Sequence, residues 1–156
     1  MSGRAGLPKS VLGLATGVVL LAVLWFSASA ASSQNQDPRQ AKPFHLTKEC
    51  SGFSGEAGWY CTIRSANVKA IKVGSMIFYF QPDTKTGTDS DMVIYVDRGT
   101  VATGHCDVAS ATGRGLCTIS DGTGALAGFH LRVRVSPHST VPNLWRWDGT
   151  YGFSRG

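Results

Sequence analysis

Four cysteines are the residues of this 156-residue chain whose type and spacing point most clearly to a chemistry. They form two sequential pairs, each 11 positions apart, with a glycine-rich stretch inside each pair. A strand, a turn and a return strand would bring the members of a pair side by side. Four cysteines allow three connectivities, and we predict the pairs Cys50–Cys61 and Cys106–Cys117. Zinc is not expected, because the closely spaced ligand pairs of zinc sites are missing from the sequence.

Three polar residues of the predicted strands are candidate catalytic groups: Asp91, His130 and Arg132. Histidine has a pKa near neutral, so His130 could act as a general acid or base inside a barrel. The alternative is that His130 faces solvent. Which of these two interpretations holds depends on which face of the strand lines the interior. Asp91 also forms a pair of carboxylates with Asp89, for which a polar turn is the simpler interpretation.

No further catalytic motif is recognised. Gly122-Thr123-Gly124 lacks the serine of a nucleophile elbow and the lysine of a phosphate-binding loop. We also predict neither a metal nor a cofactor. The formal net charge is +5, but Lys and Arg do not cluster. Nucleic-acid binders usually show a basic patch or stripe, so no nucleic-acid partner is expected.

Aromatic residues are the candidates for a ligand site. Ligand pockets are lined by apolar and aromatic side chains with a few convergent polar groups. Core packing is the alternative interpretation for each candidate. A solvent-exposed row of Trp145, Trp147 and Tyr151 would instead suit binding to a sugar polymer or another protein. The five candidates are Tyr79, Tyr95, Trp145, Trp147 and Tyr151.

The N-terminal segment is typical of a secretory signal. Two basic residues precede an uncharged apolar run at 11–26, and small residues follow at 28–30. We predict a signal peptide at 1–30 and a polar, flexible linker at 31–42. Retention as a membrane anchor at the cell surface is the alternative, although a spanning helix needs roughly 20 apolar residues. A secreted protein folds in an oxidising compartment, where disulfides persist.

Residues 43–156 are predicted to form one all-β domain. Short β-prone runs separated by turn residues are the pattern of a sandwich or a barrel. The segment 65–73 is ambiguous between a helical turn and an extended strand. Eight runs are predicted as strands, at 44–50, 59–64, 75–81, 91–97, 101–108, 115–120, 125–136 and 145–153.

The pattern of apolar residues differs between these runs. The runs at 125–136 and 145–153 alternate between apolar and polar residues, which is typical of half-buried strands. The runs at 75–81 and 91–97 are apolar on both faces, and such strands need cover on both sides. In a barrel the outer cover would come from another subunit or a covering segment, so the pattern favours a homo-oligomer, a dimer or a trimer.

The stretch at residues 121–130 is DGTGALAGFH, and it resembles the G-T-G-x-[FL]-x-G motif of dirigent proteins and allene oxide cyclase-like barrels. The order of the preceding elements is similar: an aromatic strand at 76–80, a polar loop ending at Asp91, a strand at 92–97 and a cysteine hairpin. The final stretch, WRWDGTY, resembles the closing strand of exported bacterial proteins of this barrel group. The resemblance covers residues 44–156.

This resemblance implies an eight-stranded antiparallel β-barrel, often trimeric, whose lumen binds a hydrophobic small molecule. Enzymatic members of the group convert a reactive intermediate into a cyclised or coupled product. We therefore predict a secreted barrel that binds a small apolar molecule and could steer a cyclisation by holding one conformer and excluding water. No catalytic acid or base of the family maps onto a residue of this chain. The alternative is a non-enzymatic cell-surface or carbohydrate-binding module.

Overall fold

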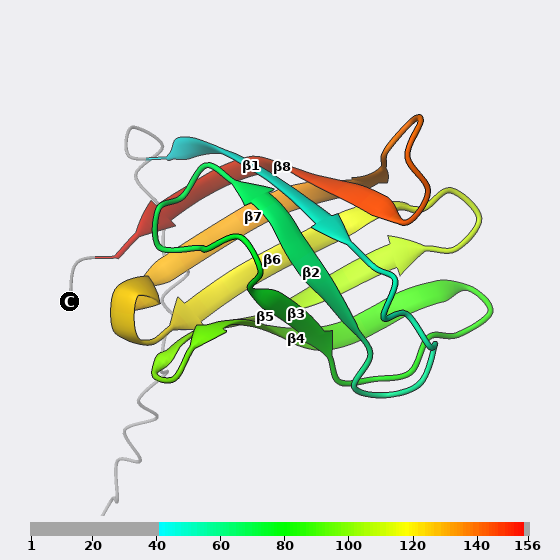
Figure 1. Cartoon of the computed structure of the whole chain (residues 1–156), viewed down its shortest axis with the longest axis horizontal. Helices are drawn as coiled ribbons and strands as arrows, with labels where there is room; N and C mark the ends of the chain where they lie inside the picture. Colours follow the sequence, from blue (N-terminus) through cyan, green and yellow to red (C-terminus); the bar gives the residue numbers. More distant parts are fainter. Residues whose placement is uncertain (1–40, 155–156) are drawn as a thin grey trace, which may run out of the picture. The chain divides into compact units, whose positions relative to one another are not determined.

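The computed structural model describes residues 41–154. Within them, eight antiparallel strands pair in sequence order and the last pairs with the first, which closes a barrel (Figure 1). The predicted eight-stranded antiparallel barrel is therefore confirmed. The strands are β1 (Lys42–Glu49), β2 (Tyr60–Ala66), β3 (Met76–Tyr79), β4 (Gly87–Asp97), β5 (Thr100–Ala109), β6 (Arg114–Gly122), β7 (Phe129–Pro137) and β8 (Leu144–Phe153).

The predicted signal peptide at 1–30 and nearly all of the predicted linker at 31–42 lie outside the described residues. The first strand begins at Lys42, one residue before the predicted start of the domain. No helix in the described part of the chain has the length and apolar character needed to cross a membrane.

Alternating side chains build the core of the barrel. On β7 the four inward-facing apolar residues are buried, whereas Arg132 and Arg134 between them are exposed. On β3 and β4 the inward-facing apolar side chains are those of Ile77, Tyr79, Met92 and Ile94. The four buried residues of β7 are Phe129, Leu131, Val133 and Val135.

The seventh strand begins later than the sequence predicts. Residues 125–136 were expected to be extended, but Gly124–Leu126 form a short 3₁₀ helix and β7 begins only at Phe129. Two glycines with positive φ, Gly124 at 57° and Gly128 at 71°, allow the chain to turn there. The turn points Leu126 into the barrel, where it is fully buried.

The fourth strand begins earlier than the sequence predicts. Thr88 and Ser90 resemble loop residues in the sequence, yet both lie in β4 and both are buried. Hydrogen bonds satisfy these inward hydroxyls: Thr88 Oγ1 donates to Asp83 Oδ1 at 2.7 Å, and Ser90 Oγ donates to Gln81 Oε1 at 3.0 Å. The strand can therefore place polar residues inside the barrel without leaving them unpaired.

Glycines on inward-facing positions let neighbouring strands approach closely. A Cβ atom at Gly104 of β5 would lie 2.0 Å from the Thr118 carbonyl oxygen, and one at Gly149 of β8 would lie 2.1 Å from the Arg132 carbonyl oxygen. A side chain at either position would collide with backbone atoms of the adjacent strand. Glycine kinks of this kind allow strands to bend enough to close a small barrel.

Both predicted disulfides are present. Cys50 is bonded to Cys61, and Cys106 is bonded to Cys117, with a Cα–Cα distance of 4.1 Å in each case. Cys106 and Cys117 are direct cross-strand partners of β5 and β6, and both side chains are fully buried. The two disulfides are consistent with folding in an oxidising environment.

The two ends of the barrel differ. The loops β2–β3, β4–β5 and β6–β7 meet at one end, where Val68, Ile71 and Leu126 are buried in the core. The ambiguous segment at 65–73 therefore supplies two of the apolar side chains that close this end of the barrel. The other end carries the loops at 50–59, 80–86, 110–113 and 138–143, and we call it the pocket end.

Candidate functional site

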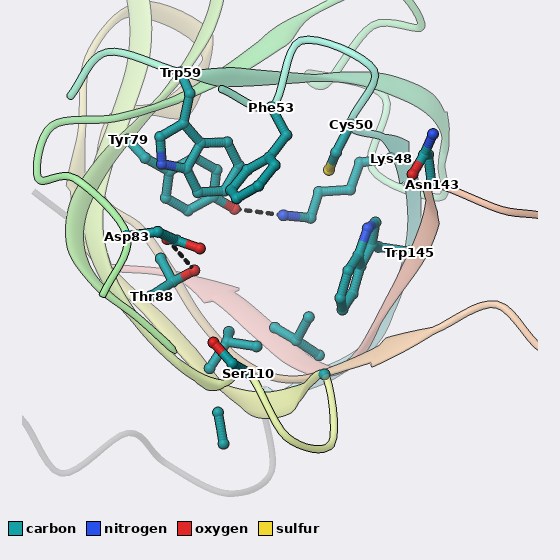
Figure 2. Close-up of a pocket in the computed structure, with 14 residues that line it drawn as sticks. Lys48, Cys50, Phe53, Trp59, Tyr79, Asp83, Thr88, Ser110, Asn143 and Trp145 are labelled. Atoms are coloured by element: carbon teal, nitrogen blue, oxygen red, sulfur yellow. Dashed lines mark hydrogen bonds between the residues drawn. The ribbon is translucent and has the colours of Figure 1, made fainter. Parts of the chain in front are cut away.

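A cavity of about 160 Å³ opens at the pocket end of the barrel. Its floor is formed by inward-facing strand residues and its rim by the four loops of that end (Figure 2). An engineered apolar cavity of about 150 Å³ can hold benzene. The cavity therefore has room for a molecule of about one aromatic ring.

The most unusual residue of the cavity is Lys48. In β1 it follows Phe44 and Leu46 on the inward face, so the alternation of the strand directs its side chain into the barrel, where it is only 4% exposed. The Lys48 Nζ atom donates a hydrogen bond to Tyr79 Oη (Figure 2). The same atom lies 4.8 Å from the centre of the Tyr79 ring and 5.1 Å from that of Trp147, within the range of cation–π interactions.

Burial changes the protonation of both groups. Desolvation lowers the pKa of Lys48 to about 7, although the negative charge of Asp83 acts in the opposite direction. Desolvation raises the pKa of Tyr79, with a further contribution from Asp83. Near neutral pH the Lys48 amine is therefore present in both charged and neutral forms, while the Tyr79 hydroxyl keeps its proton.

Aromatic rings form two walls around this amine. The Trp59 ring stacks on the Tyr79 ring with centroids 4.0 Å apart and an interplanar angle of 10°. Phe53 packs edge-on against Trp59 at 5.0 Å. Trp145, the cross-strand partner of Lys48 on β8, lies on the opposite side of the amine (Figure 2). The amine thus sits between aromatic surfaces.

Hydrogen bonds between loops hold the rim of the cavity. The Cys50 backbone N–H donates to the Asn143 carbonyl at 2.9 Å, and the Asp83 backbone N–H donates to the Gly55 carbonyl at 2.9 Å. The Cys50–Cys61 disulfide joins the two ends of the loop that carries Phe53 and Trp59. The aromatic wall is therefore fixed by covalent as well as hydrogen bonds.

The predicted ligand-binding aromatics separate into three groups. Tyr79 and Trp145 line the cavity, and Trp147 is completely buried below it. Tyr151 also faces the interior but packs near Phe44, with ring centroids 6.0 Å apart, away from the cavity. Tyr95 lies on the outer face and is 39% exposed. The expected aromatic row on β8 thus faces into the barrel and not into solvent.

The three candidate catalytic residues lie on the outer face of the barrel, and none of them lines the cavity. Asp91 Oδ1 pairs with His105 Nδ1 at 3.0 Å, while His130 Nδ1 contacts the Gly128 carbonyl at 3.2 Å. Arg132 is exposed on β7. Their positions follow from strand parity, since each lies next to an inward-facing apolar residue.

Asp89 and Asp91 enclose His105 on the surface. His105 Nε2 lies 2.9 Å from Asp89 Oδ1. The hydrogen bond to His105 is the main cause of a lowered pKa at Asp91, and the hydrogen bond to Asp91 is the main cause of a raised pKa at His105. No cluster among residues 41–154 has the geometry to hold a metal ion. We interpret this group as a solvated ion-pair network.

The sequence analysis did not select most of the residues that line the cavity, among them Lys48, Phe53, Trp59 and Asp83. One signal for Lys48 was present in the sequence. In the predicted run at 44–50 it occupies the same parity as Phe44 and Leu46, which places a charge on an apolar face. Phe53, Trp59 and Asp83 come from loops, whose relative positions depend on how the barrel closes.

No protein-family model matches the chain, and comparisons with curated proteins and with solved structures found no significant match. The resemblance to dirigent proteins and allene oxide cyclase-like barrels therefore remains a prediction. The functional argument rests on the geometry of the cavity.

Proposed function

We propose that this protein binds a small, mainly apolar molecule of about one aromatic ring in the cavity at the pocket end. The observation that carries the proposal is a cavity of about 160 Å³ whose aromatic walls surround a single buried amine. Apolar walls supply most of the binding free energy of such a site, and a few convergent polar groups orient the ligand. Here Lys48 and Tyr79 would contact the polar group of the ligand.

Steering of a cyclisation or coupling reaction remains a further step of this proposal. Containment would require the ligand to be held in one conformation with water excluded. The rigid rim, held by the Cys50–Cys61 disulfide and cross-loop hydrogen bonds, favours such containment. Export of the protein by a cleaved signal peptide is part of the same proposal.

The carbohydrate-binding alternative has less support. It depends on a solvent-exposed row of Trp145, Trp147 and Tyr151, and Trp147 has no exposed surface. A binding surface for a sugar polymer would have to be formed by other residues.

Titration of the purified protein with toluene and p-cresol, followed by tryptophan fluorescence, tests the proposal. Two of the tryptophans, Trp59 and Trp145, line the cavity, so we expect saturable quenching. Val108→Phe fills the cavity from β5 and should abolish the saturable signal. Val101→Phe is the matched control, because Val101 lies on the same strand but faces outward.

Saturable quenching that is lost only in Val108→Phe would support binding in the cavity. Quenching that is linear with concentration for both probes, or equally affected by both variants, would overturn it. Native mass spectrometry of the protein purified from its own host gives independent evidence, since a retained apolar molecule would identify the chemical class of the ligand.

A further inference from the structure

The Lys48 amine has an environment that differs from that of a surface lysine. Within residues 41–154 no carboxylate oxygen lies within 4.0 Å of its Nζ atom, whereas Lys72 Nζ forms an ion pair with Asp97 Oδ2 at 2.7 Å. The Lys48 amine is directed into the cavity, and its only hydrogen-bond partner in the described residues is Tyr79 Oη. A buried amine without a close counter-ion favours its neutral form, which carries the nucleophilic lone pair.

We propose that Lys48 forms an imine with an aldehyde or ketone group of the small aromatic molecule that occupies the cavity. This inference rests on the proposed binding function, and it adds the chemical class of the ligand. The geometry supports it because Lys48 Nζ lies between the aromatic walls that would hold the ring (Figure 2).

The reaction needs no oxidant or reductant. The lone pair of the neutral Lys48 Nζ attacks the carbonyl carbon and a C–N bond forms, while the C=O π bond breaks; one of the two nitrogen protons then passes to the oxygen to give a carbinolamine. Loss of the remaining N–H proton and cleavage of the C–O bond then release one water molecule and leave the C=N double bond. The net change is amine plus carbonyl compound to imine plus water.

Tyr79 is placed to transfer a proton during these steps. Its hydroxyl contacts the reacting nitrogen and remains protonated, because burial raises its pKa. It can therefore relay a proton, giving its own to the oxygen that develops charge and taking one from the nitrogen, so that its own protonation does not change.

The charges around the cavity favour a neutral ligand over an anionic one. Asp83 lines the same cavity, accepts a hydrogen bond from Thr88 and acts electrostatically on both Lys48 and Tyr79. A ligand carboxylate would be repelled by this group, whereas a carbonyl compound carries no net charge. The cavity volume limits the ligand to about one ring with a short substituent.

Reductive trapping tests the proposal. The purified protein is incubated at pH 7 with benzaldehyde and sodium cyanoborohydride, and the modified residue is identified by peptide mass mapping. We expect one benzyl group per chain on Lys48, formed at least about tenfold faster than on Lys72, because an ordinary lysine is almost fully protonated at this pH. The rate should fall as the pH is lowered below 7.

Three variants distinguish the reaction of Lys48 from the slower modification of surface lysines. Lys48→Met should remove the fast modification, whereas Lys72→Met, the matched surface control, should leave it unchanged. Tyr79→Phe retains the ring and should slow modification at saturating benzaldehyde roughly tenfold or more. The wild-type mass map alone decides the main question if a variant fails to fold.

Two outcomes overturn the imine and separate it from the binding function. Modification spread over surface lysines with Lys48 unreacted, although p-cresol still binds saturably, would remove the imine and leave the binding proposal intact. The same pattern without saturable p-cresol binding would overturn both.

Discussion

Lys48 combines a titratable group with almost complete burial, which lowers protein stability whenever the group is charged. Its exposed fraction is 4%, and desolvation lowers its pKa from 10.5 to about 7. The hydrogen bond to Tyr79 and the two neighbouring rings offset part of the desolvation cost. A residue that is unfavourable for stability and lies in a cavity is a candidate for function.

The pH dependence of stability should reveal this residue. An unfolded lysine keeps its proton to about pH 10.5, whereas folded Lys48 loses it near pH 7. Between these values the unfolded chain binds more protons, so the free energy of unfolding rises with pH. We expect the wild type to gain up to roughly 4 kcal/mol relative to Lys48→Met between pH 7 and 10, at about 1.4 kcal/mol per pH unit.

Urea denaturation at several pH values measures this difference. In Lys48→Met the Tyr79 hydroxyl loses its partner, but that cost does not vary with pH below the tyrosine pKa. The exposed Lys72→Met serves as the control and should give a profile parallel to that of the wild type. Parallel profiles for Lys48→Met would mean that Lys48 titrates like a surface lysine, contrary to the burial argument.

Among the elements, the β1–β2 loop contributes both to the stability of the protein and to the wall of the cavity. It supplies Phe53 and Trp59, and the Cys50–Cys61 disulfide joins its ends. The Cys106–Cys117 disulfide has the same sequence separation, 11, but links two strands inside the barrel. The two disulfides should therefore contribute similarly to stability and differently to binding.

Alanine replacement of each cysteine pair separates these contributions. By loss of chain entropy in the unfolded state, closing a loop of this size stabilises by roughly 2–3 kcal/mol. We expect both double variants to lose about this amount in urea denaturation. Only Cys50→Ala with Cys61→Ala should also weaken p-cresol binding, because it frees the loop with the aromatic wall. Equal binding losses in both variants would contradict this role of the loop.

Two glycines of β8 provide a test of how the barrel closes. Gly149→Ala would place a Cβ atom 2.1 Å from the Arg132 carbonyl oxygen, so strands β7 and β8 would have to separate. Overpacking of this kind costs roughly 1–3 kcal/mol, and occasionally more. In Gly152→Ala, the matched control, the contact at 2.4 Å is with the His130 ring, which can move away.

Thermal denaturation should therefore show a clearly lower Tm for Gly149→Ala than for Gly152→Ala. If both variants melted together, the close strand approach at Gly149 would not be required for the barrel.

At the scale of the whole molecule, the outer face of β2 to β4 carries aromatic side chains. Tyr60 and Tyr95 are 40% and 39% exposed, and Phe78 between them is half-buried. Phe78 and Tyr95 belong to the two runs that are apolar on both faces, the pattern from which we predict a dimer or a trimer. That oligomer stays a prediction, because a single chain is described.

Sedimentation velocity tests the predicted oligomer. We expect a dimer or trimer at micromolar concentration, and Tyr95→Arg should shift the protein toward the monomer by placing a charge on the apolar face. Arg132→Ala, on the outer face of β7, is the control and should leave the assembly unchanged. A wild-type monomer over the whole concentration range would refute the prediction.

The strands were predictable because alternation and turn residues are local properties of the sequence. The eight predicted runs all correspond to strands, and the disulfides follow from hairpin spacing. The prediction was wrong where local signals compete with tertiary contacts. The sequence predicts Leu126 in a strand, but the residue lies in a short 3₁₀ helix and packs into one end of the barrel. It predicts Thr88 and Ser90 in a loop, but both lie in β4 and form hydrogen bonds inside the barrel.

The sequence by itself therefore determined an all-β domain with two short-range disulfides. It also determined that Lys48 lies on the same face of its strand as Phe44 and Leu46. Only the tertiary structure decided which aromatic residues share a cavity. Lys48, Trp59, Tyr79, Asp83 and Trp145 come from different strands and loops, and they meet because β8 pairs with β1. Strand parity is a property of neighbouring residues, whereas the convergence of loops at one end depends on barrel closure.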